Sequence, residues 1–420
     1  MASTSPENLA RQILEQCIAG QPWSADALAA LVSECDSAQG TLALFAGLVE
    51  PLGDLFEPSL ADRYVEIFSE VIAQSLAGQN AAELRERHLR IKALRRYQGG
   101  LVQKVFVLSR ITLGADIAIT SQFLQAACAI FSDAEIYFVG PRKNYEMFAA
   151  ERRIQFLEVA YSRTGLLLER LESAMQLSRV LQSPNSLVLD PDSRLSQLGL
   201  LPVGEADNYY FFESRSFGYP GEQSLGQLTG EWLNQVFGFK GAMPWIMPWI
   251  MPWIKISPIG LASAVSADVT VSFGFGDNPA KRVGPAFELQ MVKQLRSRGF
   301  SVLIDEGGSV VEMENARRIA SLTGALTHQG SFPSFSQAIK TSRLYLGYDS
   351  VGQHAAAAMG IPLVTAFRGW IGPRMLQRWT PWGHGIRRVV PLTTENSDQA
   401  FQRVITEVDQ LLSPRKNRQG

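Results

Sequence analysis

The chain has 420 residues, of which 46% are hydrophobic and 19% are charged. This length suggests two or three domains, and the composition excludes a largely disordered chain. The formal net charge is -1, from 39 basic and 40 acidic residues, which excludes general electrostatic binding to nucleic acid.

The cysteines and the N-terminus indicate the compartment. Cys17, Cys35 and Cys128 lack metal-ligand spacing and are too few for a disulfide framework. The N-terminus has no basic start followed by an apolar region, and we expect no stretch of about 18 apolar residues that spans a bilayer. The sequence therefore predicts a soluble, cytoplasmic protein, with peripheral attachment to the inner face of a membrane left open.

The first hundred residues carry helical patterns only. From Ser5 to about Arg96, apolar residues recur at helical spacing. The stretch "SPEN" offers a Ser cap followed by Pro, and "SLAD" and "NAAE" are typical of capping boxes. We expect an all-α accessory domain over residues 1–98.

The pattern changes at Leu101. A short β-branched run, "LVQKVFVLS", is followed by a helical stretch, "DIAITSQFLQAACAIF", and by a second strand, "EIYFVG". This βαβ unit predicts a first Rossmann-like domain over residues 99–255.

A second series of alternating strands and helices begins near Asp268. Its strands are predicted in "DVTVSFGFG", "FSVLIDEGG", "RLYLGYD" and "IPLVTAF", with helices between them. Such alternation is typical of a doubly wound parallel sheet, whose ligands bind beyond the carboxyl ends of the strands. We predict a second Rossmann-like domain over residues 256–420.

Between the two series the sequence repeats "MPWI" three times. Pro at every fourth residue excludes a helix interior and disfavours a central strand, so we expect an extended or turning segment. One hypothesis is an enlarged linker loop, in which only the last repeat belongs to the original path. The other is an apolar patch of Trp245, Trp249 and Trp253 that contacts a membrane-borne acceptor or a partner protein.

The stretch from Tyr345 to Phe367 carries the clearest candidate site. A buried strand ends at Tyr348, "DSVG" forms a tight turn, and the helix that follows directs its free N–H groups outward. His354 in the first turn can contact a phosphate. The alternative is that Asp349 or Ser350 only caps the helix.

Further charged residues follow other strands. Lys281 and Arg282 come just past one strand, where they can neutralise a diphosphate, although a solvated loop is the alternative. Glu306, Glu312 and Glu314 follow the next strand, where a carboxylate can accept the hydroxyls of a ribose.

In the first series, Gly114 permits a tight turn and Asp116 stands at the predicted start of the helix. Asp116 is either a general base or an N-cap. Asp192 and Arg194 open a later turn, where they either cap a helix or bind an acceptor. The sequence shows no metal cluster, Walker loop or dinucleotide fingerprint, so we expect no metal and no cofactor.

Three of these stretches together resemble glycosyltransferase family 9, the heptosyltransferase-like enzymes. They are "VFVLSRITLGADIAITSQFLQAACAIFSDAEIYFVG", "NPAKRVGPAFELQMVKQLRSRGFSVLIDEGG" and "GYDSVGQHAAAAMGIPLVTAF". The resemblance covers roughly residues 101–412. It implies the GT-B fold, with the acceptor domain first and the donor domain second.

The family's late motif is Asp, Ser or Thr, Gly, two variable residues and His, followed by an Ala-rich helix that binds the donor diphosphate. Asp349, Ser350 and His354 match it, with Val351 at the position of the family's Gly and Gly352 one step later. The resemblance implies that this motif binds the donor.

The early motif is Leu, Gly, Asp, which matches Leu113, Gly114 and Asp116 with Ala115 inserted. The resemblance implies that Asp116 is the general base on the acceptor hydroxyl, and Lys281 resembles the phosphate-binding Lys. We expect Arg282 to contact the sugar donor, and Glu312 rather than Glu306 to contact its ribose. The expected acceptor contacts are Asp192 and Arg194.

The sequence and the resemblance together predict an inverting, metal-independent transfer of a sugar from a nucleotide-diphosphate sugar. The expected partners are that donor and a glycan or glycolipid acceptor of the bacterial cell envelope, with no nucleic acid. Two alternatives stay open, a catalytically silent protein that binds nucleotide sugars and a sugar-nucleotide epimerase of similar fold.

Overall fold

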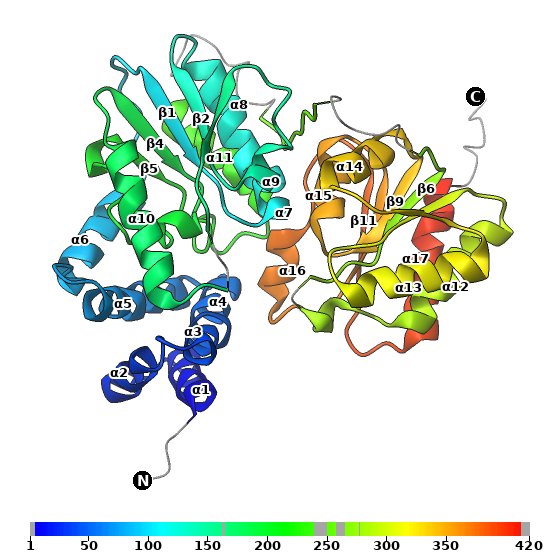
Figure 1. Cartoon of the computed structure of the whole chain (residues 1–420), viewed down its shortest axis with the longest axis horizontal. Helices are drawn as coiled ribbons and strands as arrows, with labels where there is room; N and C mark the ends of the chain where they lie inside the picture. The colour runs from blue at the N-terminus through cyan, green and yellow to red at the C-terminus, as the bar shows by residue number, and fades with distance from the viewer. Residues whose placement is uncertain (1–4, 162–163, 239–249, 258–264, 277, 413–420) are drawn as a thin grey trace. The chain divides into compact units, whose positions relative to one another are not determined.

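The computed structural model of the chain describes residues 5–161, 164–238, 250–257, 265–276 and 278–412. The chain forms two compact units, each built on one parallel sheet (Figure 1). The first unit contains Met1–Tyr145, Glu151–Ile250 and Ile371–Arg378, and the second contains Glu146–Ala150, Met251–Trp370 and Trp379–Gly420.

The N-terminal segment is helical over its described length. Ser5 caps the first helix and Asn80 caps the last one, as their side chains suggested. The expected cap at "SLAD" is wrong, because that helix begins at Pro58 after Glu57. The helices are α1 (Pro6–Ile18), α2 (Ala25–Ser33), α3 (Ala38–Leu44), the π-helix η1 (Phe45–Val49), α4 (Glu50–Asp54), α5 (Pro58–Ser75) and α6 (Ala81–Lys92).

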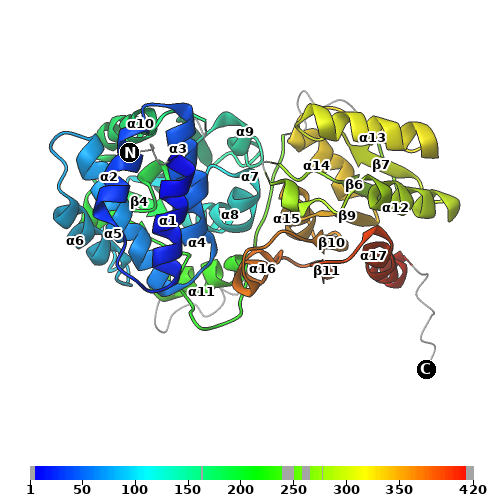
Figure 2. The same ribbon diagram turned by 90° about the horizontal axis from the view of Figure 1, so that it is seen from below.

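These helices share one apolar core with the first sheet. Leu28, Phe68 and Ile72 of the helical segment belong to the same buried cluster as Phe106 and Val188 of the strands. Figure 2 shows α1 to α5 gathered side by side within the first unit. The helical segment is therefore built into the unit that holds the first sheet rather than being a compact unit of its own.

The first sheet is parallel, with strand order β3-β2-β1-β4-β5. Its strands are β1 (Lys104–Leu108), β2 (Glu135–Gly140), β3 (Ile154–Glu158), β4 (Ser186–Asp190) and β5 (Tyr209–Phe211). Its helices are α7 (Leu113–Ala115), η2 (Asp116–Thr120), α8 (Ser121–Ile130), α9 (Arg142–Tyr145), α10 (Leu167–Leu181), α11 (Leu225–Phe237) and α16 (Pro373–Trp379). Two single 3₁₀ turns, η3 (Arg194–Ser196) and η4 (Ala206–Asn208), follow β4.

The run from α7 to α8 is one continuous helical stretch, Leu113–Ile130. It is long and apolar enough to cross a membrane, with a mean hydropathy of 1.3, so the expectation of no such stretch is wrong. Because 67% of it is buried and α8 packs on β1 and β2, it has the character of a core helix.

The second sheet is also parallel, with strand order β11-β10-β9-β6-β7-β8. Its strands are β6 (Val269–Ser272), β7 (Val302–Asp305), β8 (Leu326–His328), β9 (Leu344–Tyr348), β10 (Leu363–Phe367) and β11 (Arg387–Pro391). Its helices are η5 (Pro279–Lys281), α12 (Pro285–Ser297), α13 (Val310–Thr323), α14 (Phe332–Thr341), α15 (Val351–Ala358) and α17 (Ser397–Leu412). Phe287, Ile319 and Val404, from α12, α13 and α17, pack in one cluster with the strands. The doubly wound α/β fold predicted from the sequence is confirmed.

Only the last "MPWI" repeat lies among the described residues. It is neither helix nor strand, and the ring of Trp253 packs edge-on against Phe148 at 5.3 Å between ring centroids. The backbone of Lys255 exchanges hydrogen bonds with Met147 and Ala150. The half-buried Trp253 is thus seated within the second unit, whereas Trp245 and Trp249 lie outside the described residues.

Candidate functional site

The second sheet has its topological switch point between β6 and β9. Lys281 follows β6 and Asp349 follows β9, so both residues lie beyond the carboxyl ends of these two neighbouring strands. An open parallel sheet binds its ligand at this place, because the loops of the two strands diverge there and leave a crevice.

Lys281 and Asp349 form an ion pair across the switch point. The Lys281 ammonium lies 2.9 Å from Asp349 Oδ2 and donates a hydrogen bond of 3.1 Å to the Asp349 carbonyl oxygen. Gln353 Nε2 donates to Asp349 Oδ1 at 2.5 Å. The Lys281 side chain keeps 22% of its surface exposed, so it remains accessible to a ligand.

Helix α15 begins beside this pair with its first N–H groups uncapped. Ser350 stands at the N-cap but makes no capping hydrogen bond, and its hydroxyl is buried without a partner in the described structure. In contrast, Ser309 and Glu312 form a complete capping box on α13. The first turn of α15 therefore offers unused donors and the positive end of a helix dipole to an anion.

Gly352 sets how closely α15 approaches the sheet. A Cβ at this position would lie 2.1 Å from the hydroxyl of Tyr345, a fully buried side chain of β9. Gly352 stands one residue after the position of the family's Gly, and this close contact gives a packing reason for a glycine there. Val351 takes the place of the family's Gly and is the first residue of the helix.

His354 is the fourth residue of α15, and its side chain is buried. Burial lowers its pKa to about 4, against the opposing charge of Asp349, so the imidazole is neutral at pH 7. Its Nδ1 has no hydrogen-bond partner among the described residues, and the ring packs edge-on against Trp379. A ligand that reaches Nδ1 would satisfy a buried polar atom.

Arg282, which the sequence predicts to contact the sugar donor, forms an ion pair with Glu288 in this structure. Its guanidinium donates to both oxygens of the fully buried Glu288, at 2.8 and 2.9 Å. Tyr348 Oη donates to Glu288 Oε1 at 2.9 Å, and Asn315 Nδ2 donates to Oε2 at 2.6 Å. In this structure Arg282 and Glu288 hold the loop that carries Lys281.

Glu312, the predicted ribose contact, joins two loops. It accepts backbone hydrogen bonds from Phe275 at 2.8 Å and from Gly308 and Ser309 at 3.0 Å each. Burial alone would raise its pKa, but these N–H groups hold the pKa of Glu312 below its usual value. The carboxylate is thus charged, and both of its oxygens already accept hydrogen bonds from backbone N–H groups.

Glu306 is also paired, because Arg317 contacts both its oxygens at 2.9 to 3.1 Å. This hydrogen-bonded partner lowers the pKa of Glu306. Of the acidic residues predicted at this strand end, neither Glu306 nor Glu312 is left without a protein partner.

The switch point of the first sheet lies between β1 and β4. Asp116 follows β1 and Asp192 follows β4, so the two predicted residues lie beyond the carboxyl ends of neighbouring strands. Arg110 stands between them, since its backbone N–H donates to Asp116 Oδ1 at 2.7 Å and its guanidinium lies 3.6 Å from Asp192 Oδ2.

The Asp116 carboxylate is fully buried and accepts four hydrogen bonds. The donors are Ser109 Oγ at 2.6 Å, the Arg110 N–H at 2.7 Å, Thr120 Oγ1 at 2.6 Å and Asn144 Nδ2 at 2.5 Å. Burial raises the pKa of Asp116, and the four donors oppose that shift. Asp116 is not an N-cap, because the helix begins at Leu113 and Thr112 occupies the cap position.

A π turn, η2, starts at Asp116 and ends at Thr120. One residue inserted into an α-helix is accommodated by such a turn, because the i to i+5 hydrogen bond encloses one more residue. Relative to the family's motif, the inserted residue is Ala115. In this structure the helix that contains the π turn still packs on β1 and β2, and Thr120 of the same turn donates a hydrogen bond to Asp116.

Asp192 and Arg194, the predicted acceptor contacts, face the helical segment. Asp192 has a left-handed backbone, with φ of 70°, and its Oδ2 lies 2.6 Å from Arg215. Its Oδ1 is buried without a hydrogen-bond partner in the described structure. Arg194 pairs with Glu50 of α4 at 3.1 Å. Both residues are thus in contact with protein partners.

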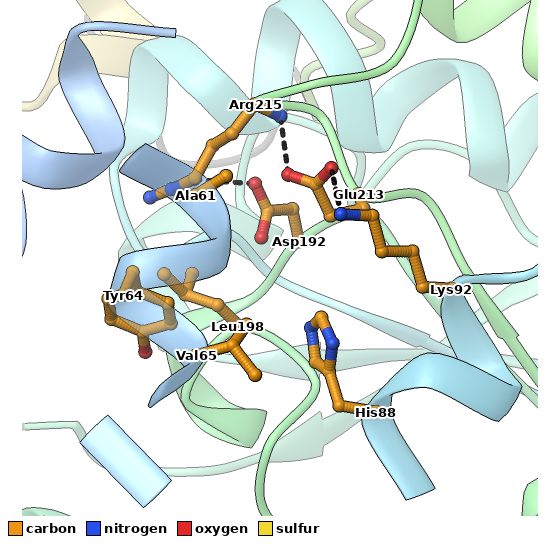
Figure 3. A pocket seen from close by; sticks show the side chains of 9 residues that line it. All are labelled: Ala61, Tyr64, Val65, His88, Lys92, Asp192, Leu198, Glu213 and Arg215. Carbon is orange, nitrogen blue, oxygen red and sulfur yellow. Dashed lines mark hydrogen bonds and ion pairs between the residues drawn. The ribbon is translucent and has the colours of Figure 1, made fainter. Parts of the chain in front are cut away.

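Figure 3 shows the cavity beside Asp192. Tyr64 of α5, His88 and Lys92 of α6, and Glu213 and Arg215 after β5 surround it. Its volume of about 10 Å³ holds about one water molecule. The helical segment therefore closes over this part of the carboxyl edge of the first sheet.

The residues that sequence reasoning missed are the partners of the predicted ones. Glu288, Asn144 and Arg215 each hold a predicted residue through a buried charged or amide group. No motif marks them. Among the described residues, no group of three or more His, Cys, Asp or Glu side chains is placed to hold a metal ion.

Comparisons with known proteins show the fold. No protein-family model matches the sequence, and no curated protein matches it. The structure of ADP-heptose LPS heptosyltransferase II from E. coli superposes with a TM-score of 0.50 and 19% identity, covering 74% of this chain and 98% of that one.

Two further solved structures agree. A glycosyltransferase family 9 protein from Veillonella parvula has a TM-score of 0.53 and 14% identity, over 75% of this chain and 100% of that one. The E. coli heptosyltransferase WaaC, solved with ADP-2-deoxy-2-fluoro heptose, has a TM-score of 0.54 and 13% identity, over 73% and 99%. This chain has the GT-B-like fold of these heptosyltransferase structures, and about a quarter of its length lies outside each superposition.

Proposed function

We propose that the protein is a glycosyltransferase that moves a sugar from a nucleotide-diphosphate sugar to an acceptor hydroxyl. The observation that carries this proposal is the uncapped start of α15 beside Lys281, at the switch point of the second sheet. A diphosphate fits this place, because it takes hydrogen bonds from helix-end N–H groups and charge from a lysine.

The fold supports the same proposal. Structures of similar fold were solved with ADP and with an ADP-heptose analogue, so a nucleotide-sugar donor is the natural first candidate. In the proposed reaction, α15, Lys281 and His354 stabilise the charge that builds on the departing diphosphate. A carboxylate of the first unit, Asp116 in our proposal, takes the proton from the acceptor hydroxyl.

We propose further that the transfer inverts the anomeric configuration, needs no metal ion and takes place in the cytoplasm on a cell-envelope glycan or glycolipid. A direct displacement requires only a base on the acceptor and stabilisation of the leaving diphosphate. The lysine and the helix terminus supply positive charge where a metal would otherwise act. Measuring the anomeric configuration of the product by NMR, and turnover in the presence of EDTA, tests these two points.

The proposal is tested in two stages. A panel of ADP-, GDP-, UDP- and CDP-sugars is first screened for thermal stabilisation, since a ligand at 100 times its Kd adds about 2.7 kcal/mol. The sugar that stabilises the protein is then incubated with envelope glycan extracts, and nucleotide diphosphate release is measured.

The outcomes separate the candidate functions. Release that depends on the acceptor is the expected result. Stabilisation without release, with any extract, indicates a binding protein, and a change of the sugar without acceptor indicates an epimerase. Absence of stabilisation by every nucleotide sugar contradicts the proposal.

A further inference from the structure

A groove of about 500 Å³ lies at the amino edge of the first sheet. It is lined by residues that precede β1 and by residues just before or at the start of β4 and β5, whereas Asp116 and Asp192 lie beyond the opposite, carboxyl ends of β1 and β4. Its volume is typical of a site for a small ligand and far exceeds that of the cavity beside Asp192. The groove is therefore separate from the candidate site of the same unit.

One wall of the groove offers a row of unused backbone donors. The segment Gln98–Val102 lines it, and within the described part of the chain these five residues donate no backbone hydrogen bond. Gly99 and Gly100 have φ of 88° and 128°, and a Cβ on either would meet nothing within 4 Å. Since no side chain covers the glycines, a ligand can reach their N–H groups directly.

The groove is also lined by side chains that carry acceptors and amide groups. The side chains of Asp207 and Asn208, at the end of η4, are exposed. In the described structure neither makes a side-chain hydrogen bond or an ion pair. Asn185 is also exposed, and its side chain donates a long hydrogen bond of 3.4 Å to Gln103 Oε1. Carboxylate and amide oxygens thus line the same groove as the row of backbone donors.

Contacts within the protein fix part of the lining of the groove before any ligand binds. Arg95 donates to the carbonyl oxygens of Ala206 and Tyr209 at 2.5 and 2.7 Å and stacks on the Tyr210 ring at 4.7 Å. The Tyr97 ring packs against Tyr210 and two phenylalanines. Because these lining side chains are already held in place, binding orders few additional groups.

The charges and hydrogen-bonding groups that line the groove indicate which class of ligand it can bind. Arg95 is committed to the protein, which leaves Arg96 and Asp207 as opposite charges at the rim. A strong anion would meet the Asp207 carboxylate, and an apolar ligand would leave the donors unpaired. Sugar hydroxyls both donate and accept hydrogen bonds, so they can pair with the backbone N–H groups and with the carboxylate and amide oxygens.

From these contacts we propose that the groove binds a neutral oligosaccharide, as a glycan-binding site remote from the candidate active site. It rests on the proposed function in one respect, because its natural occupant is then a distant part of the acceptor glycan. Binding there holds a glycan on the enzyme through sugars that do not react, which raises the local concentration of its acceptor end.

The test follows hydrogen exchange of the full chain with neutral hexasaccharides of glucose, galactose, mannose and N-acetylglucosamine. At least one of them should slow exchange in residues 95–103 several-fold, because the free N–H groups become bonded. Asp207→Ala and Asn208→Ala should each weaken that binding about tenfold, and Glu205→Ala, on an exposed neighbour outside the groove, should leave it unchanged.

Three results would overturn the proposal. They are no protection of residues 95–103 by any of these sugars, equal binding by the groove variants, or protection by inorganic phosphate instead. Nucleotide-sugar stabilisation, measured in parallel, reports on the candidate donor site in the second unit. A protein that binds donor but no hexasaccharide fails only this proposal, and one that binds hexasaccharide but no donor fails only the proposed function.

Discussion

The Lys281 ammonium lies 2.9 Å from the Asp349 carboxylate and thereby joins the loops that follow β6 and β9. The pair holds the lysine at the switch point before any ligand is present. Its side chain therefore loses little conformational entropy when a diphosphate binds. The two residues are 68 positions apart in the chain, and only the parallel pairing of β6 with β9 brings them together.

Replacing Lys281 by Ala should weaken nucleotide-sugar binding by about 10- to 100-fold, as expected for one charge-assisted hydrogen bond. Titration calorimetry with the stabilising donor measures the effect. Lys340→Ala is the matched control, because Lys340 is an exposed lysine on α14 of the same unit. Equal affinities for Lys281→Ala and the unaltered protein would remove Lys281 from the donor site.

Glu288→Gln should destabilise the second unit by about 3 kcal/mol, because it leaves Arg282 partly buried without its counter-charge. Donor affinity should fall as well, since the loop that carries Lys281 loses its anchor. Denaturant unfolding and calorimetry measure the two effects. If donor affinity falls while stability is unchanged, Arg282 and Glu288 act on the ligand rather than on the loop.

The sequence predicted the elements of both sheets where apolar runs are long, and β2 was placed with its observed bounds. It placed Lys281 and Asp349 beyond strand ends and His354 in the helix that follows β9, and the structure has them at these places. It did not show that Arg282 and Glu312 are committed to protein partners. Those partners lie on other elements or on backbone N–H groups, which side-chain patterns do not reveal.

The region between β2 and the "MPWI" repeat was left without elements. The strands there are β3, β4 and β5, of five, five and three residues, which are too short to show a clear alternation or a long apolar run. The association of the helical segment with the first sheet was also missed. An amphipathic face shows that a helix packs, but it does not show which surface it packs on.

Because of this shared core, removal of residues 1–96 should leave an insoluble or aggregating protein. The deletion uncovers the face of the first sheet that carries Phe106, Leu108 and Val188. Solubility and circular dichroism of the shortened chain measure the outcome. A soluble, folded product that still binds nucleotide sugar would show that the helices are dispensable.

His88 should make the stability of the first unit depend on pH. Burial, with the nearby charge of Lys92, lowers the pKa of His88 to about 4 from an ordinary 6.5. Between these values the unfolded chain binds the proton and the folded chain does not. Stability is therefore fully present above pH 6.5 and is lost as pH falls towards 4.

The expected loss is on the order of 2 to 3 kcal/mol, measured by urea unfolding at several pH values. His88→Gln should remove this part of the pH dependence. His354 titrates in the same range but lies in the second unit, so His354→Gln serves as the control. Identical pH profiles for His88→Gln and the unaltered protein would contradict the prediction.

Asp116→Asn tests the proposed base directly. The four donors around Asp116 leave no oxygen of the carboxylate unbonded, so an acceptor hydroxyl must displace one of them to reach it. The amide would also turn an NH₂ group towards other donors, which should cost about 1 to 3 kcal/mol of stability. Donor binding in the second unit should be unchanged.

If Asp116 is the base, turnover by the folded Asp116→Asn protein should fall by about 10²- to 10⁴-fold, and the acidic limb of the pH–rate profile should disappear. Thr120→Val is the matched control, because it removes one donor at 2.6 Å but keeps the carboxylate. It should lower stability by about 1 kcal/mol and preserve turnover.

A loss of stability in Asp116→Asn with turnover within tenfold of normal would make Asp116 a positioning residue that fixes the π turn and Arg110. The base would then have to come from another group of the first unit, and Asp192, with its unpartnered buried Oδ1, is the next candidate.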